Sequence, residues 1–332
     1  MKNLKIAIIG CHRNYLKEDL IPLILQKKYN FKFISDPKNA DIILQGVFFN
    51  NPFKKKINRY IDFFVDRFSD VNTNKDKSIK NIIDPNLNKI WIHVSGESPN
   101  NNNKSSFLNS ECDFGIGHEI ILHPNYIRMP FWYQSLDWSN FGFHRTDDAF
   151  YRLGSPIQIN QLMSGISSSE IKKKKLKCAI FASHLTTPRE IFVKEIQKFI
   201  DVDIFGITGN GPVQFKNSKP KRDILNDYVF TLCPENNLYP GYITEKIPES
   251  FACGSFPLSW YMDSYESDFT IDSHLNIADY GAKALICDGK LADLVEKKYH
   301  HIKNEGVEPL LYKTPTLDPI IAILDKVIGN CL

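Results

Sequence analysis

The run of side chains best equipped for chemistry is the segment 233–246, which reads CPENNLYPGYITEK. It follows an apolar run that predicts a buried strand, passes through Pro, Gly and Asn, and enters a predicted helix near Thr244. A polar loop at the carboxyl end of a parallel strand suits a ligand, and a helix start suits a phosphate. Lys246 would add a full positive charge, Glu245 could accept hydrogen bonds from ribose hydroxyls, and Tyr242 could stack on a nucleotide. A plainer interpretation stays open, in which Thr244 only caps the helix and Glu245 only favours its dipole.

A second candidate is Glu97, in the segment 91–99 that reads WIHVSGESP. It lies just past a predicted buried strand, beside Gly96 and before Pro99. A carboxylate held in such a turn suits a general base. The alternative, a solvated loop glutamate, stays open.

The third candidate is Arg189, in the segment 181–190 that reads FASHLTTPRE. Pro188 opens a predicted helix, as proline does in a first turn. Arg189 in that turn could bind a pyrophosphate with its forked guanidinium, or form an ordinary surface ion pair. His184 is interpreted as structural rather than catalytic.

Other polar segments point less clearly to chemistry. The aromatic side chains of 126–133 (YIRMPFWY), after 113–119 (DFGIGHE), could form a sugar platform, although their spacing favours core. The adjacent Asp147 and Asp148 suggest a metal motif, but such pairs are common on surfaces. The turn at 10–15 (GCHRNY) lacks two of the three glycines of a dinucleotide-binding turn, and no Walker loop is present. A nicotinamide enzyme and a P-loop NTPase are therefore disfavoured.

The elements that must position these residues alternate between strands and helices. Predicted strands are 5–10, 31–34, 41–46, 89–94, 177–182, 202–206, 228–233 and 255–260, and predicted helices are 17–28, 189–199 and 244–253. Short apolar strands in alternation with helices predict parallel sheets covered on both faces. The pattern restarts in the second half, so we predict two doubly wound α/β domains with a ligand cleft between them.

Composition limits the function classes. The 332 residues are 42% hydrophobic and 24% charged, and 41 Lys and Arg against 38 Asp and Glu give a net charge of +3, too small to favour nucleic acid as the main partner. Seven cysteines, none in a CxxC pair, argue against a disulfide framework and a structural zinc site. No run of 18 apolar residues and no signal sequence are found, so we expect a cytoplasmic protein. A small, polar stretch at 164–170 and the lysines 172–175 indicate a domain boundary; the lysines suit a solvated linker or, alternatively, anionic lipid headgroups at a membrane surface.

Together these segments resemble the alpha-1,3-fucosyltransferases of glycosyltransferase family 10. Glu97-Ser98-Pro99 resembles the acceptor-domain motif E-S-P of that family. The stretches 113–117 and 126–130 are similar to those that follow it in bacterial members. Glu235-Asn236-Asn237, followed by 242–246 (YITEK), resembles the donor motif E-N-S…Y-[IV]-T-E-K, and the resemblance covers about 91–260.

The resemblance implies a GT-B fold, with an acceptor-binding Rossmann-like domain over 1–165 and a GDP-sugar-binding one over 176–332. It implies an inverting transfer of L-fucose from GDP-fucose, with Glu97 as the general base and Arg189 and Lys246 on the pyrophosphate. Glu245 and Tyr242 would hold the nucleoside end. The remaining donor-binding residues that it implies are Glu235, Asn236 and Thr244. Pro248, deep in a helix that starts at Thr244, is expected to shift or kink that helix.

The partners that it implies are GDP-fucose and an oligosaccharide or glycolipid acceptor, such as an N-acetylglucosamine-containing, Lewis-type surface glycan. Acceptor choice is expected to depend on the loops 70–80 and 100–106. No cofactor or metal is expected to be required, because two cations and a helix dipole can neutralise the leaving GDP; a stimulatory divalent ion stays open. Two alternatives remain, which are a GT-B enzyme that uses another nucleotide sugar and a non-catalytic sugar-nucleotide-binding protein.

Overall fold

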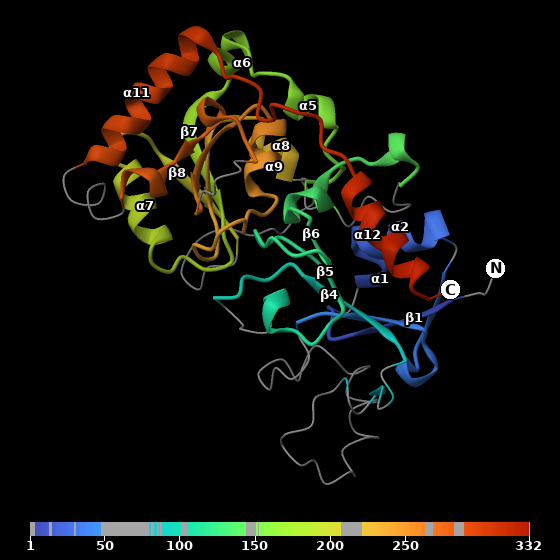
Figure 1. Cartoon of the computed structure of the whole chain (residues 1–332). Coiled ribbons are helices and arrows are strands. Elements are labelled where there is room, and N and C mark those ends of the chain that lie inside the picture. The colour runs from blue at the N-terminus through green and yellow to red at the C-terminus, as the bar shows by residue number, and fades with distance from the viewer. Residues whose placement is uncertain are drawn as a thin grey trace. The chain divides into compact units, whose positions relative to one another are not determined.

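A computed structural model describes residues 4–12, 15–29, 31–47, 80, 83–84, 86, 88–100, 105–143, 151, 153–206, 221–262, 268–281 and 289–331. These residues form two compact units (Figure 1). Unit 1 consists of Met1–Phe131, Ser139–His144 and Thr316–Leu332, and unit 2 consists of Trp132–Trp138 and Arg145–Pro315.

Unit 1 is built on a six-stranded parallel sheet with the order β2-β1-β3-β4-β5-β6. Its strands are β1 Lys5–Ile9, β2 Lys32–Ile34, β3 Ile42–Gln45, β4 Ile90–Ser95, β5 Phe114–Gly117 and β6 Tyr126–Arg128. The central strands are nearly continuous runs of buried apolar residues, as a sheet covered on both faces requires. The helices of this unit are α1 Tyr15–Glu18, α2 Leu20–Tyr29 and α12 Asp318–Gly329, with short 3-10 turns at η1 Pro37–Asn39, η4 Phe107–Asn109 and η6 Ser139–Phe141.

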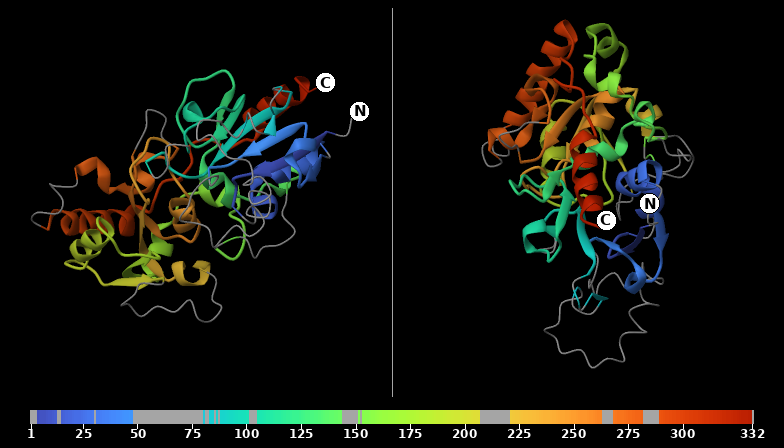
Figure 2. Two further views of the ribbon diagram at one scale, coloured as in Figure 1. Left: turned by 90° about the horizontal axis from the view of Figure 1, so that it is seen from below. Right: turned by 45° about the vertical axis from the view of Figure 1, so that its right-hand side comes forward.

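The last helix, α12, packs on unit 1, although it ends the chain. The Tyr29 hydroxyl of α2 donates to Asp325 Oδ1 at 2.8 Å, and Lys326 Nζ donates to Asn125 Oδ1 at 2.7 Å, just before β6. Both views of Figure 2 show this red helix near the blue N-terminal segments. The expected second domain, 176–332, includes these residues, so unit 2 ends earlier, at Pro315.

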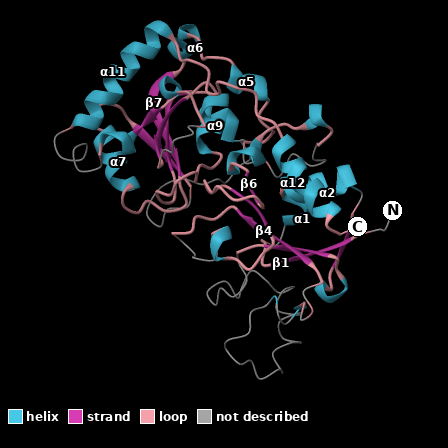
Figure 3. Cartoon of the chain, in the orientation of Figure 1, coloured by secondary structure: helices cyan, strands magenta, loops and turns pink. Residues whose placement is uncertain are grey.

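Unit 2 carries a five-stranded parallel sheet with the order β11-β10-β9-β7-β8. Its strands are β7 Lys175–Phe181, β8 Val202–Phe205, β9 Tyr228–Pro234, β10 Phe256–Trp260 and β11 Leu275–Asn276. Its helices are α5 Ile159–Met163, α6 Ser168–Lys173, α7 Arg189–Ile196, α8 Lys221–Leu225, α9 Lys246–Ala252 and α11 Lys290–Glu305, with 3-10 turns at η8 Ile271–Ser273 and η9 Ile277–Tyr280; a further turn, η5 Phe131–Ser135, lies where unit 1 passes into unit 2. In Figure 3 the magenta strands lie among cyan helices in each unit.

The predicted alternation of strands and helices is confirmed, and so is the α/β class with two parallel sheets. The stretch expected to be a linker is instead ordered structure. Ser167 caps α6 in a reciprocal bond pair with Glu170, and Lys174 Nζ donates to the carbonyl oxygens of Asn226 at 2.6 Å and Cys253 at 2.8 Å. Lys175 already begins β7. The lysine run is therefore part of the helix and strand of unit 2 and not a linker, although Lys172, Lys173 and Lys175 are exposed.

Two more expectations concern cysteines and the membrane. The cysteines within the described ranges are all free, whereas Cys287 lies outside those ranges. No helix in the described part of the chain combines the length and the apolar character needed to span a bilayer.

Candidate functional site

The loop between β9 and α9 lies at the carboxyl end of the middle strand of the unit 2 sheet. β9 is buried along its whole length and pairs with β7 and β10, and the Glu235 N–H continues the register by donating to the Trp260 carbonyl at 3.0 Å. The helix begins at Lys246, not at Thr244 as predicted, and its N-cap is Glu245. Pro248 therefore falls in the first turn, where a proline removes no helical hydrogen bond, and the expected kink has no cause.

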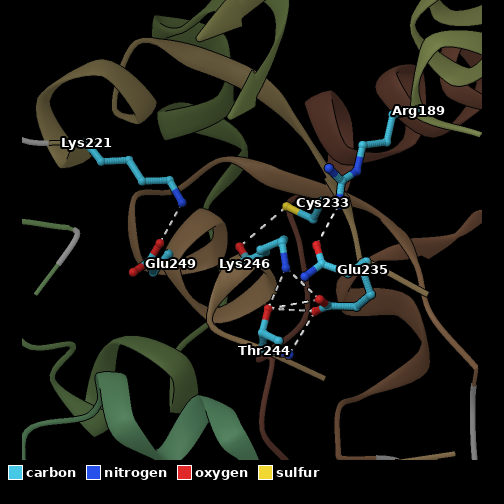
Figure 4. Close-up of polar contacts among 8 residues, drawn as sticks. Arg189, Lys221, Cys233, Glu235, Thr244, Lys246 and Glu249 are labelled. Atoms are coloured by element: carbon cyan, nitrogen blue, oxygen red, sulfur yellow. Dashed lines mark hydrogen bonds and ion pairs between the residues drawn. The ribbon is translucent and has the colours of Figure 1, made fainter. Parts of the chain in front are cut away.

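Glu235 occupies the centre of this loop with a carboxylate that the chain itself uses completely (Figure 4). Its Oε1 accepts the Thr244 N–H at 2.8 Å and the Thr244 hydroxyl at 2.9 Å. Its Oε2 accepts the same hydroxyl at 2.9 Å and lies 2.5 Å from Lys246 Nζ. The side chain of Glu235 is fully buried, so this pair is desolvated on the glutamate side. A buried charge requires such a set of partners.

Lys246 is held in place by the same network but keeps one side open. Its Nζ also donates to Thr244 Oγ1 at 2.7 Å, and 19% of its side chain is exposed. Its carbonyl oxygen accepts a weak bond from the buried Cys233 Sγ at 3.4 Å. The ammonium group is thus fixed by two acceptors, in a side chain that is still partly exposed.

Arg189 reaches the same loop from the first position of α7. Figure 4 shows the Arg189 side chain pointing toward this loop. Its Nη2 donates to Asn236 Oδ1 at 2.6 Å, and its Nη1 donates to the His184 carbonyl at 3.2 Å. Burial lowers the pKa of the guanidinium, while the charges of Glu235 and Tyr242 raise it, and arginine stays charged in either case. Two cations from separate segments therefore meet at one loop. His184, which the sequence indicates to be structural, supplies only its backbone carbonyl to this arrangement.

The remaining donor-loop residues are close by but differ in exposure. Asn236 is exposed, Glu245 is half-buried, and Thr244 is buried, with 5% of its surface exposed. Only 2% of the surface of Tyr242 is exposed, which leaves little of it for stacking on a nucleotide. The contacts predicted for these four residues with a nucleotide stay predictions.

A second buried ion pair involves the helix α9 that follows this loop, and the sequence gives no sign of it. Lys221 Nζ, from α8, donates to Glu249 Oε2 of α9 at 2.6 Å (Figure 4). The two residues are 28 positions apart, and Lys221 lies in no recognisable motif. Only the packing of α8 near α9 could reveal their contact.

Glu97 lies in unit 1, in the turn that follows β4. Its N–H donates to Ser95 Oγ at 3.3 Å, and the Ser95 hydroxyl lies 3.2 Å from the Glu97 carbonyl. Gly96 is required here because a Cβ would lie 2.4 Å from the Phe131 ring. Ser98 is fully buried, whereas Glu97 is half-buried. The turn is therefore fixed on both sides of a half-buried glutamate.

Behind this turn the structure places a group of buried polar side chains. His93 Nε2 lies 3.0 Å from the Ser105 carbonyl, and Glu119 Oε2 accepts the Phe107 N–H at 2.8 Å. His118 lies near His93, and burial lowers its pKa to about 4. Burial lowers the pKa of His93 as well. The contacts of His93 and Glu119 hold the segment 105–107 against β4 and the chain that follows β5.

The aromatic segment after β5 is core, as its spacing favours. Tyr126, Trp132 and Met129 are all buried, with exposed fractions of 6%, 3% and 7%. The stretch forms β6 and the adjoining 3-10 turn η5 rather than an open sugar platform. Within the described ranges no cluster of three or more His, Cys, Asp or Glu side chains could hold a metal ion, and the pair Asp147 and Asp148 lies outside those ranges, as do the loop residues 70–79 and 101–104.

Comparison with known proteins places these features in context. Residues 171–301 match the model of the C-terminal region of glycosyltransferase family 10 (fucosyltransferase). The chain is 27% identical over 252 residues to "Alpha-(1,3)-fucosyltransferase FucT" of Helicobacter pylori, which covers 70% of this chain and 48% of that protein. It is 30% identical over 174 residues to "Alpha-(1,3)-fucosyltransferase fut-1" of Caenorhabditis elegans, which covers 50% of this chain and 34% of that one. The chain thus spans about half the length, or less, of these relatives.

Solved structures show the same fold. A crystal structure of an alpha1,3-fucosyltransferase matches 99% of this chain and 90% of its own with a TM-score of 0.61 at 19% identity. A second, of an alpha1,3-fucosyltransferase with GDP-fucose, matches 98% and 90% with a TM-score of 0.61 at 20% identity. The two parallel sheets are therefore those of a GT-B fold, as expected.

Proposed function

This chain belongs to glycosyltransferase family 10, and on that premise we propose that it is an inverting alpha-1,3-fucosyltransferase that uses GDP-fucose. The observation that carries the proposal is the meeting of Arg189 and Lys246 at the loop after β9. Two cations at the carboxyl end of a parallel strand suit the pyrophosphate of a nucleotide sugar.

At the donor end, Arg189 and Lys246 hold the pyrophosphate and neutralise the charge that develops on the leaving GDP. Glu245 accepts hydrogen bonds from the ribose, and Asn236 and Tyr242 shape the pocket around the nucleoside. Glu235 acts through Lys246, because both of its oxygens are already taken by Thr244 and Lys246. Its role, and that of Thr244, is to hold the ammonium group in place.

At the acceptor end, Glu97 is the general base. Its carboxylate takes the proton of the attacking sugar hydroxyl while that oxygen forms a bond to the anomeric carbon of fucose. The bond from that carbon to the GDP oxygen breaks, and its electron pair leaves with GDP. Attack from the face opposite GDP inverts the anomeric configuration. The support for Glu97 is a half-buried carboxylate in a turn fixed by Ser95 and Gly96.

The finer parts of the proposal concern the acceptor, the metal and the location. We expect an N-acetylglucosamine-containing surface oligosaccharide, of the kind that leads to Lewis-type structures, and a cytoplasmic enzyme. Because two cations already face the leaving group, transfer is expected without a divalent ion.

A donor panel tests the proposal. The purified chain is incubated with N-acetyllactosamine and, separately, GDP-fucose, GDP-mannose or UDP-galactose, with and without EDTA. Mass spectrometry should show a product one deoxyhexose heavier with GDP-fucose only, and EDTA should not abolish it. Transfer from a different donor would assign another nucleotide sugar, and binding of GDP without transfer to any acceptor of a wider panel would favour a non-catalytic binding protein.

A further inference from the structure

Lys221 is a buried cation that none of the roles above uses. Its side chain is 10% exposed, that of its partner Glu249 is 3% exposed, and the Nζ–Oε2 distance is 2.6 Å. The ammonium group also lies 5.0 Å from the centre of the Phe181 ring, at the end of β7. Lys221 is thus enclosed between α8, α9 and the sheet.

The pKa of Lys221 also depends on the charge of Glu245, the residue proposed to hold the ribose. Burial acts to lower the pKa of Lys221, but the carboxylates of Glu249 and then Glu245 outweigh it and raise that pKa. Glu249 lies one helical turn after Glu245, and its N–H donates to the Glu245 carbonyl at 2.9 Å. Glu249 is therefore in direct contact with Lys221, whereas Glu245 acts on Lys221 through its charge alone.

The charges of the donor loop balance only when Lys221 is included. The two ion pairs, together with Arg189 and Glu245 of the proposed donor site, comprise the cations Arg189, Lys246 and Lys221 and the anions Glu235, Glu245 and Glu249. Three against three gives no net charge at a loop that must accept a multiply charged anion. Without Lys221, the same group would carry one net negative charge and would repel a pyrophosphate.

We propose that Lys221 is a positioning residue of the donor site, which neutralises Glu249, offsets the charge of Glu245 and so allows an anionic nucleoside diphosphate to bind. The inference rests on the proposed function of the loop, and Lys221 itself contacts no substrate. A purely structural pair would stabilise α8 against α9 with no dependence on the charge of the ligand.

Opposite substitutions of the pair distinguish these roles. Both K221M and E249Q break the same ion pair, so a structural role predicts that both weaken GDP binding. A charge role predicts that K221M weakens GDP binding on the order of tenfold, because the negative charge of Glu249 is then no longer neutralised near the anionic ligand. E249Q should bind GDP at least as tightly as the wild type, and K221R should restore most of the affinity.

The measurement is calorimetric titration of each folded variant with GDP and with guanosine, which lacks the pyrophosphate. K221M should lose affinity for GDP but less than threefold for guanosine. The matched control is K194M, which breaks an exposed pair with Glu190 on α7 and should change neither affinity. Circular dichroism confirms that each variant is folded.

A parallel loss of GDP affinity in K221M and E249Q, or an equal loss for guanosine, would overturn the proposal. If K221M does not fold, E249Q alone decides, since a loss of GDP affinity in that variant contradicts a charge role. If the wild type fails to bind GDP at all, the proposed function of the loop has failed instead. If the wild type binds GDP and K221M binds it with the same affinity, only the inference about Lys221 is refuted.

Discussion

The carboxylate of Glu235 and the ammonium group of Lys246 form an ion pair that is closed on the glutamate side and open on the lysine side. The Oε2–Nζ distance is 2.5 Å, and the exposed fractions of the two side chains are 0% and 19%. The buried carboxylate of Glu235 thus holds the partly exposed side chain of Lys246 in place at the loop. The first prediction follows from the burial of the glutamate.

Replacing Glu235 by alanine should destabilise the protein by about 3–5 kcal/mol, because it leaves Lys246 and the Thr244 N–H without their partner. The matched control is Glu190→Ala, which removes an exposed pair with Lys194 and should cost less than about 1 kcal/mol. Urea unfolding followed by circular dichroism gives both values. Similar losses in the two variants would show that the Glu235 pair is not desolvated.

Lys246→Ala and Arg189→Ala should each weaken GDP binding by on the order of 1.5–3 kcal/mol, because each removes a charge-assisted contact to the pyrophosphate. Calorimetric titration measures the affinities, with Lys194→Ala as a control far along α7 from the loop. Unchanged affinity in both variants would remove these residues from the phosphate site.

GDP should stabilise the protein against heat and UDP should not, since the pocket is proposed to recognise guanine. At a concentration 100 times the dissociation constant, the gain is about 2.7 kcal/mol. Thermal unfolding with each nucleotide at equal concentration measures the difference. Equal protection by UDP would refute the guanine assignment.

His274 should make the stability of unit 2 sensitive to acid. Its Nε2 lies 2.9 Å from the Tyr261 hydroxyl, and its Nδ1 lies 3.2 Å from Ser273 Oγ, which itself donates to the Thr270 carbonyl at 2.5 Å. Burial lowers the pKa of His274 from 6.5 to about 4; the Lys298 charge also lowers it, whereas the Thr270 backbone and the Asp272 charge raise it.

Because the unfolded chain then binds a proton that the folded chain does not, stability is lost as the pH falls from 6.5 toward 4. Between pH 7 and pH 5 this one histidine should account for about 2 kcal/mol. The variant His274→Gln lacks this pH-dependent contribution. The difference in unfolding free energy between wild type and variant should therefore be smaller at pH 5 than at pH 7, by about 2 kcal/mol. Urea unfolding at both pH values measures the difference, and a difference that stays constant would show that His274 titrates normally.

The sequence predicts the bounds of a strand well where a short run of residues is mostly apolar. Val202–Phe205 and Phe256–Trp260 lie within a residue of their predicted bounds. In Phe256–Trp260 four of the five residues are buried, as in a strand covered on both faces, whereas Val202–Phe205 is an edge strand of which only the first residue is buried. Phe114–Gly117 was interpreted only as a motif, since its two glycines hide a strand. One of them, Gly115, is needed because a Cβ would lie 2.5 Å from the Phe107 ring.

The site was predicted in part, for a physical reason. The resemblance implied that Arg189 and Lys246 act on one pyrophosphate, and both follow parallel strands whose carboxyl ends share an edge of the sheet. The partner of each charge could not be predicted, because contacts such as Lys221 with Glu249 depend on how helices pack. The sequence therefore indicated that Glu235 belongs to the loop, but not that its carboxylate faces Lys246 and Thr244 rather than solvent.

The central claim is that one chain divides the reaction between a donor loop around Lys246 and a base, Glu97, on the other unit. The most direct test is Glu97→Gln, which keeps the size of the side chain but cannot take up a proton at neutral pH. Fucose transfer from GDP-fucose should fall by about 10²–10⁴-fold. The affinity for GDP, measured by calorimetry on the same preparation, should change by less than about 1 kcal/mol. Transfer within about threefold of the wild type, or a large loss of GDP affinity, would contradict this division of labour.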